Sequence, residues 1–182
     1  LCDCLTRRTF VPWSVRLARR IGRHVVTGLE MLMGLAAAVL VLQDHWVWGV
    51  VLIQVFGVFS CVDGEIARIQ GYPSKLGDFL DTLTDRVTEF LLIAAISISL
   101  SSQVDPVSAL SAGFAMLGGV FVLTTSSEKF RSAWQKSYPK RRLERLFCFL
   151  SAGSEVRLLI LSIGLLASVA IGDASILLWM VW

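Results

Sequence analysis

Charged residues are scarce in this chain of 182 residues. Asp, Glu, Lys and Arg make up 17% of it and apolar residues 55%, whereas soluble domains carry about 25% charged residues. A chain this apolar is not intrinsically disordered, and a net charge of only +3 does not favour nucleic acid as a partner. The mean hydropathy of +0.69 indicates a membrane protein, and the length is that of one domain.

Cysteine is also rare, with four residues at Cys2, Cys4, Cys61 and Cys148. They have neither the spacing of a zinc site nor the density of a disulfide-stapled secreted domain. We therefore expect four reduced thiols with no shared role. The first 23 residues are rich in arginine and lack the apolar core of a secretory signal.

Long apolar runs recur along the chain, separated by short polar breaks. A membrane-spanning helix needs roughly 20 residues, and the first five runs reach that length with flanking residues. The runs are 26–43, 46–62, 87–104, 107–127, 156–172 and 174–182. We expect an all-α, polytopic membrane protein whose domain of six transmembrane helices occupies 26–182. The sixth run holds only nine residues, so we expect this helix to continue past Trp182.

All 17 Lys and Arg residues lie in alternate breaks between the runs. They fall in 7–23, 68–86 and 129–145 and at Arg157, and the intervening breaks contain none. Because positive charge is retained in the cytoplasm, the split predicts an integral protein of the plasma or inner membrane. The N-terminus and the basic segments are predicted to face the cytoplasm.

The N-terminal segment 1–25 has an amphipathic pattern. Trp13, Leu17 and Ile21 are four residues apart and so share one helical face, and arginines occupy the rest. This pattern predicts an interfacial helix that lies on anionic headgroups. A plain, positively charged flank is the alternative interpretation.

Carboxylates are concentrated between the second and third runs. Asp81 and Asp85 are one helical turn apart, and Asp63 lies near the end of the preceding run. A loop around Tyr72–Lys75 would bring the two helix ends together. Keeping three carboxylates charged and unpaired at one membrane edge costs considerable free energy. Since hard divalent cations prefer oxygen ligands, the cluster predicts a metal site that faces the cytoplasm.

The pattern D-G-x-x-A-R-x8-G-x-x-x-D-x-x-x-D, from Asp63 to Asp85, closely resembles the signature of the CDP-alcohol phosphatidyltransferase family, and all seven fixed positions match. The segment DGEIAR is similar to the corresponding segment in one branch of the family. Members of that branch are fused to, or partnered with, sugar- or inositol-phosphate cytidylyltransferases. The resemblance implies a membrane transferase of phospholipid or inositol-phosphate biosynthesis. Such an enzyme moves the substituted phosphate of a CDP-alcohol to a hydroxyl acceptor, a lipid or a polyol phosphate, and releases CMP.

The resemblance also implies roles for individual residues. Asp81 and Asp85 would be catalytic, with Asp85 as the base that deprotonates the attacking hydroxyl. The ligands of Mg²⁺ or Mn²⁺, at two sites, would be Asp63, Asp81 and Asp85. The nucleotide pocket would be formed by Gly64, Ala67, Arg68 and Gly77. The acceptor would be bound by Lys129, Arg131 and Arg157. We also expect a homodimer and no nucleic acid.

One position departs from the family pattern. A further aspartate is expected three residues before the Asp-Gly pair, and Ser60 stands there. A hydroxyl is a poor substitute for a carboxylate ligand to a hard cation, so one of the two ions is expected to bind weakly. Asp78, about 20° from Asp85 around the helix, is the candidate replacement ligand. The alternative function is a catalytically silent, nucleotide-binding relative.

Several charged residues have more than one interpretation. Lys129, Arg131 and Arg157 fit the acceptor role but also fit ordinary positive-inside charge. Arg157 stands at the head of an apolar run and needs a partner, which Glu30 could supply unless Glu30 faces the cavity or is only a helix-end acid. Glu89 is expected to pair with Arg86 or another neighbour, without a catalytic role.

Overall fold

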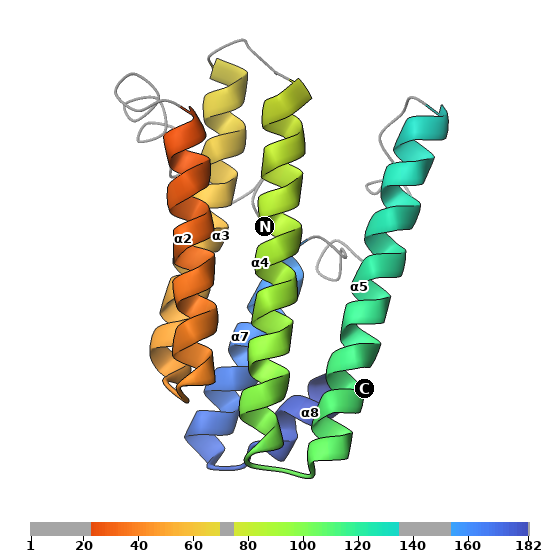
Figure 1. The fold of residues 1–182 in the computed structure, drawn as a ribbon. Coiled ribbons are helices and arrows are strands. Elements are labelled where there is room, and N and C mark those ends of the chain that lie inside the picture. The colour runs from red at the N-terminus through yellow and green to blue at the C-terminus, as the bar shows by residue number, and fades with distance from the viewer. Residues whose placement is uncertain (1–22, 70–74, 135–153, 182) are drawn as a thin grey trace.

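The computed structural model describes residues 23–69, 75–134 and 154–181, and every element in these ranges is a helix (Figure 1). Within them, side chains are not described at 23–24, 61–69, 75, 78, 81, 131, 154–156 and 179–181. The helices are α2 (Arg23–Leu42), α3 (Trp46–Ile69), α4 (Lys75–Ser101), α5 (Pro106–Trp134), α7 (Ser154–Ile171) and α8 (Ser175–Val181). The all-α prediction is therefore confirmed. The predicted interfacial helix of 1–25 lies almost entirely outside the described residues.

Each of the six apolar runs corresponds to one helix, but three helices extend well beyond their runs. Helix α5 continues to Trp134, past the predicted end at 127, and the other two are α3 and α4. The second run was placed at 46–62, whereas α3 continues to Ile69, and the third at 87–104, whereas α4 begins at Lys75. The polar signature motif supplies these extra turns, because helical backbone hydrogen bonds do not depend on apolar side chains. The motif thus lies on two helices, flanking the segment 70–74.

Two helices in the described part of the chain are long and apolar enough to cross a membrane. They are Val25–Leu42 within α2 and Pro106–Trp134, while Trp46–Ser60 and Arg157–Ile171 are shorter apolar stretches. Many large apolar side chains are exposed, among them Phe114 and Phe121 of α5. Extended exposed apolar surface is unfavourable in water, so these features agree with a membrane protein. Six spans remain a prediction.

Helix α2 packs against both α3 and α4, and α7 packs against α3 on another side of the bundle (Figure 1). Helix α5 contacts α4 and, at the end opposite the signature motif, α8. The core consists of apolar side chains from several helices, including Ile53, Leu92 and Leu165, none of which is exposed. This packing holds α4 between α2 and α5.

Small residues let the helices approach closely at two places on α4. A Cβ atom added to Gly34 of α2 would overlap the side chain of Thr88, and one added to Gly113 of α5 would overlap that of Ser97. Both threonine and serine are buried. Close approach through small residues is a common way to pack apolar helices that lack a hydrophobic driving force in lipid.

Hydrogen bonds fasten the turn between α2 and α3 to the end of α4. The Trp46 indole donates to Ser99 Oγ at 2.9 Å, and that hydroxyl donates to Asp44 Oδ1 at 2.5 Å. Asp44 has a φ of 59°, in the left-handed region. Aspartate tolerates this conformation better than most residues, and its carboxylate is held by Ser99.

Helices α5 and α8 are preceded by aspartates that bind their first turns. Asp105 accepts hydrogen bonds from Ser108 Oγ at 2.7 Å and from Ser108 N at 2.8 Å, so it serves as the N-cap of α5. Asp173 accepts a bond from Ser175 N at 2.9 Å. The hydrogen bonds from Ser108 and Ser175 lower the pKa of Asp105 and Asp173 below the usual aspartate value.

Candidate functional site

The signature motif occupies the end of α3 and the beginning of α4. Asp63, Gly64, Ala67 and Arg68 belong to the last two turns of α3. The helices end on the same side of the bundle (Figure 1). Ile69 and Lys75 are six Cα steps apart, so their Cα atoms lie within about 23 Å of each other. The fold therefore keeps the two halves of the motif near one another, at one end of the bundle.

The acids of α4 share one helical stripe, positions 78, 81 and 85, which we call the acidic stripe. At about 100° per residue, position 81 aligns with Ser99, five turns further on, and position 85 lies about 20° from Leu92. Ser99 and Leu92 are both buried in the bundle. By helical geometry, positions 78, 81 and 85 therefore fall on the same side of α4 as Ser99 and Leu92.

Two motif residues of α4 have described surroundings. Gly77 is buried and Asp85 is half-buried, as expected for an interior-facing stripe at the end of a bundle. On α3, Ser60 is half-buried and stands three residues before Asp63, so the two positions are neighbours on one helical face. The side chains of Asp63, Gly64, Ala67, Arg68, Asp78, Asp81 and Arg131 lie outside the description, so their roles remain predictions.

The donor chemistry of the motif fits a hard cation. The acidic stripe and Asp63 supply carboxylate oxygens, the ligands that Mg²⁺ and Mn²⁺ prefer. Among the side chains that the structure describes, no three metal-ligating residues gather. Of the four proposed metal ligands, only Asp85 has a described side chain.

A buried ion cluster lies one turn beyond the acidic stripe. Arg157 of α7 binds Glu89 twice, with Nε at 2.5 Å from Oε1 and Nη2 at 3.0 Å from Oε2. Arg86 Nη1 donates to the same Glu89 Oε2 at 2.7 Å. The Glu89 side chain is only 5% exposed and that of Arg157 12%. The predicted pairing of Glu89 with Arg86 is confirmed, and Glu89 also supplies a partner for Arg157.

The cluster connects elements far apart in the sequence. Glu89 and Arg157 are separated by 68 positions and join α4 to α7. Glu30 of α2, the other candidate partner, is fully buried. Two arginines share one carboxylate, so the group of Arg86, Glu89 and Arg157 carries a net charge of +1. A bidentate Arg–carboxylate pair is among the strongest hydrogen-bonding arrangements.

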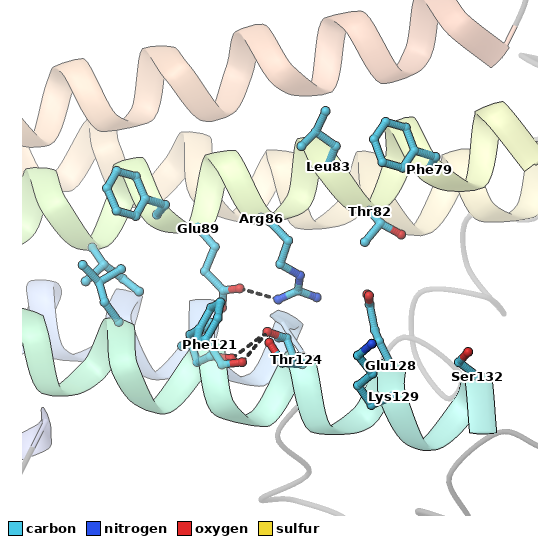
Figure 2. A pocket seen from close by; sticks show the side chains of 15 residues that line it. Phe79, Thr82, Leu83, Arg86, Glu89, Phe121, Thr124, Glu128, Lys129 and Ser132 are labelled. Atoms are coloured by element: carbon cyan, nitrogen blue, oxygen red, sulfur yellow. Dashed lines mark hydrogen bonds and ion pairs between the residues drawn. The ribbon is translucent and has the colours of Figure 1, made fainter. Parts of the chain in front are cut away.

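A pocket of about 600 Å³ lies between α4 and α5 (Figure 2), and we call it the α4–α5 pocket. One part of its wall is apolar, from Phe79, Leu83, Phe90, Ile93, Leu117, Val120 and Phe121. The rest is polar, from Thr82, Arg86, Glu89, Thr124, Thr125, Glu128, Lys129 and Ser132. Its volume is typical of small-molecule sites. Lys129, a predicted acceptor-binding residue, is exposed and belongs to this wall.

The α4–α5 pocket and the acidic stripe lie on adjacent faces of the same segment of α4. Glu89 is about 40° from Asp85 around the helix, and Arg86 is about 60° further on. Glu89 therefore stands between the acidic stripe and the pocket. The sequence analysis did not single out Arg86 and Glu89 as pocket residues. The available signal was a glutamate one turn after Asp85 in an apolar helix, where an acid needs a partner.

The family comparison identifies the class of protein that has this motif on a helical bundle with an adjoining pocket. The chain belongs to the CDP-alcohol phosphatidyltransferase family, whose model matches residues 24–182. The predicted family is therefore confirmed, and this family is one of transferases of substituted phosphate groups.

Individual relatives make the likeness more specific. A bifunctional IPC transferase and DIPP synthase of Thermococcus kodakarensis is 29% identical over 153 residues, 79% of this chain and 34% of that protein. A protein of the same name from Archaeoglobus fulgidus is 29% identical over 163 residues, 81% of this chain and 32% of the relative. A phosphatidylinositol phosphate synthase of Corynebacterium glutamicum is 39% identical over 61 residues, 34% of this chain and 28% of the relative. The chain thus spans about a third of the length of these curated relatives.

Proposed function

We propose that this chain transfers the substituted phosphate of a CDP-alcohol to a hydroxyl acceptor and releases CMP. The observation that carries the proposal is the family match over 24–182 together with all seven signature positions. The placement of that signature on the adjoining ends of α3 and α4 supports it. The reaction would take place at the cytoplasmic face of the membrane, in a homodimer.

The acidic residues would hold divalent metal and move a proton. Asp63, Asp81 and Asp85, with Asp78 as the extra ligand, would hold Mg²⁺ or Mn²⁺, whose charge neutralises the oxygens of a diphosphate. Two sites are proposed, one of them weak because of Ser60. Asp85 would accept the proton of the attacking hydroxyl, which requires a carboxylate within hydrogen-bond reach of that hydroxyl. Gly64, Ala67, Arg68 and Gly77 would line the cytidine pocket.

The acceptor is proposed to carry a phosphate, in phospholipid or inositol-phosphate biosynthesis. The relatives include phosphatidylinositol phosphate synthases as well as bifunctional IPC transferase and DIPP synthases. Lys129, Arg131 and Arg157 would bind the acceptor phosphate, for which guanidinium groups are well suited. The position of Lys129 on the wall of the α4–α5 pocket supports this assignment.

Ser60 favours a second candidate function. Without a carboxylate at position 60, a relative that binds the nucleotide but does not catalyse transfer is possible on the same scaffold. Such a protein would bind CDP-alcohol in isothermal titration with Mg²⁺ but release no CMP. The two functions are therefore separable in one purified sample.

The test is incubation of the purified protein with a panel of CDP-alcohols and acceptors, with Mg²⁺ or Mn²⁺, and mass spectrometry of the products. We expect CMP release, and we expect it to be lost in Asp81→Ala and in Asp85→Asn. Asp81→Ala should also weaken metal binding, because it deletes a ligand. Arg145→Ala, in the generic basic segment, is the control that should retain activity. Full activity of Asp81→Ala would contradict the metal site.

A further inference from the structure

Glu30 of α2 is an ionisable residue whose side chain is fully buried in the bundle. It belongs to the stripe of α2 that packs against the other helices, and the remaining residues of this stripe that the argument uses are Gly34, Ala37 and Val41, all buried. Glutamate is rarely fully buried in a core unless positive charge lies nearby. What Glu30 can do therefore depends on where it lies relative to the signature motif.

Around the axis of α2, Glu30 is placed toward both α3 and α4. At about 100° per residue, it lies about 40° from Gly34 on one side and about 20° from Ala37 on the other. A Cβ atom added to Gly34 would overlap Thr88 of α4, and one added to Gly49 of α3 would lie 3.6 Å from the Ala37 carbonyl oxygen. Glu30 thus falls between the contacts of α2 with the two helices that carry the motif.

Along the bundle, Glu30 is level with Ser60 of α3. A Cβ atom added to Gly49 would lie 2.7 Å from Val41 Cγ2, so these two residues are in register. Ser60 is as many residues beyond Gly49 as Glu30 is before Val41, and α2 and α3 run in opposite directions (Figure 1). The equal rise per residue therefore brings Glu30 and Ser60 to about the same height. Ser60 is about 20° from Gly49 around α3, so it lies on the side that packs against α2.

The acidic stripe of α4 lies at the same height. Gly34 and Thr88 are in register, and α2 and α4 run in the same direction (Figure 1). One turn before this contact, Glu30 is level with the residue next to Asp85. Position 81 is about 20° from Thr88 around α4, so it is on the side of α4 that packs against α2. Because helical side chains lean toward the N-terminus of their helix, Glu30 leans toward the motif end of the bundle.

We infer that Glu30 supplies from α2 part of the carboxylate charge that Ser60 does not supply from α3, and that it is a ligand of the weakly bound divalent ion. The inference deepens the proposed function and rests on it. The family pattern has an aspartate at position 60, on the side and at the height where α3 meets Glu30. Together with Asp63, Asp81 and Asp85, Glu30 completes a set of four carboxylates, whose charge balances two divalent ions. Carboxylate oxygens are the ligands that Mg²⁺ and Mn²⁺ prefer.

A basic side chain of the protein is the alternative partner of Glu30. In that case its charge stabilises the fold without metal, and Glu30→Gln lowers the metal-free Tm but leaves metal affinity unchanged. If Glu30 faces the ions, the neighbouring carboxylates repel it until metal binds, and Glu30→Gln lowers metal affinity. Metal affinity, rather than stability, is therefore the deciding quantity.

The experiment titrates Mn²⁺ into the purified full chain without substrate and measures the free ion by electron paramagnetic resonance. We expect wild type to bind two ions, one of them more weakly. Glu30→Gln, which keeps the shape but not the charge, should weaken the second ion about tenfold. Adding Ser60→Asp to Glu30→Gln should restore at least the wild-type affinity, because it places a carboxylate at the same height. Asp105→Asn, an acid-to-amide change on an exposed residue at the opposite end of the bundle, is the control and should bind Mn²⁺ like wild type.

Unchanged Mn²⁺ affinity in a folded Glu30→Gln protein would overturn the inference. Glu30→Asp keeps the charge on a side chain one methylene shorter, and it should weaken the second ion by less. It provides the test if Glu30→Gln does not fold, and unchanged affinity in this variant would count equally against the inference. Weaker binding in Asp78→Asn with none in Glu30→Gln would place the replacement ligand on α4 and exclude Glu30.

CMP release from the same samples separates this inference from the proposed function. A wild-type protein that binds two ions in a manner dependent on Glu30 but releases no CMP would refute the transferase while supporting the role of Glu30. A wild-type protein that releases CMP, with the same Mn²⁺ affinity as Glu30→Gln, would keep the proposed function and remove Glu30 from the metal site.

Discussion

The ion pair between Arg157 and Glu89 predicts a stability pattern that a double substitution can reveal. Removing one partner of a buried pair leaves an uncompensated charge and costs about 3–5 kcal/mol. Both side chains are largely buried, at 12% and 5% exposure, so the buried-pair estimate applies. Arg157→Met should therefore be strongly destabilising, since Arg86, at 35% exposure, compensates Glu89 only in part.

The expected loss is large enough to measure. For a protein of this length, each kcal/mol changes Tm by about 2–4 °C, so Arg157→Met should lower Tm by about 6–20 °C. The double variant Arg157→Met/Glu89→Leu replaces the pair with apolar side chains of similar volume. Such replacements are often neutral or stabilising, so the double variant should recover most of the lost Tm. Arg157→Lys, which keeps the charge but not both hydrogen bonds, should lie between wild type and Arg157→Met.

The assay is thermal unfolding of the detergent-purified proteins, followed by intrinsic tryptophan fluorescence. An Arg157→Met protein within about 2 °C of wild type would show that the pair contributes little, contrary to the buried-pair estimate. A double variant as unstable as Arg157→Met would show that the unpaired carboxylate is not the main cause of the destabilisation, and that lost packing or the unpartnered Arg86 is.

Two further predictions concern the end of the bundle opposite the signature motif. The breaks at Asp44 and Asp105 contain no Lys or Arg, which predicts that they face the outside of the cell. Asp44→Cys and Asp105→Cys should therefore react with a membrane-impermeant thiol reagent added outside the cell. Labelling only from the cytoplasm would refute this topology. The hydrogen bonds from Ser108 lower the pKa of Asp105 below its ordinary value of 3.8. The charged carboxylate of Asp105 therefore stabilises the fold fully above pH 3.8, and this stabilisation is lost as the pH falls through the lowered pKa. Asp105→Asn, which keeps an N-cap but cannot titrate, should remove that part of the acid dependence of Tm, and an unchanged acid limb would contradict the assignment.

Local patterns predicted the helices well, and their limits have a physical origin. The apolar runs located the helices because burial and lipid exposure both require continuous apolar sequence. They placed the end of α3 and the start of α4 several residues away from Ile69 and Lys75, because the motif is polar although its backbone is helical. Asp78, Asp81 and Asp85 are spaced by three and four residues, which already indicated that they lie on one face of a helix.

The sequence indicated less well which charged residues pair between helices. That Arg157 needs a partner follows from its place at the head of an apolar helix. Which acid supplies it depends on how α7 packs in the bundle, and no local pattern in a single sequence contains that information. The sequence pattern suggested Glu30 as a partner and assigned Glu89 to Arg86 or a neighbour, whereas the structure pairs Arg157 with Glu89. The α4–α5 pocket likewise depends on the separation of two helices rather than on any motif.

Ser60 is where the sequence departs most clearly from its family pattern, and it provides the last prediction. Positions 60 and 63 are neighbours on α3, so Ser60→Asp would add a carboxylate on the face of Asp63. If the second metal ion binds weakly for lack of that carboxylate, the Mg²⁺ concentration for half-maximal CMP release should fall about tenfold in Ser60→Asp, at the lower end of the usual effect of perturbing a metal site. Asp78→Asn should raise it if Asp78 is the replacement ligand. Activity that appears only in Ser60→Asp would favour the silent relative. A metal dependence unchanged in both variants would show that neither position 60 nor position 78 is at the metals, and the residue assignments taken from the family pattern would then be wrong.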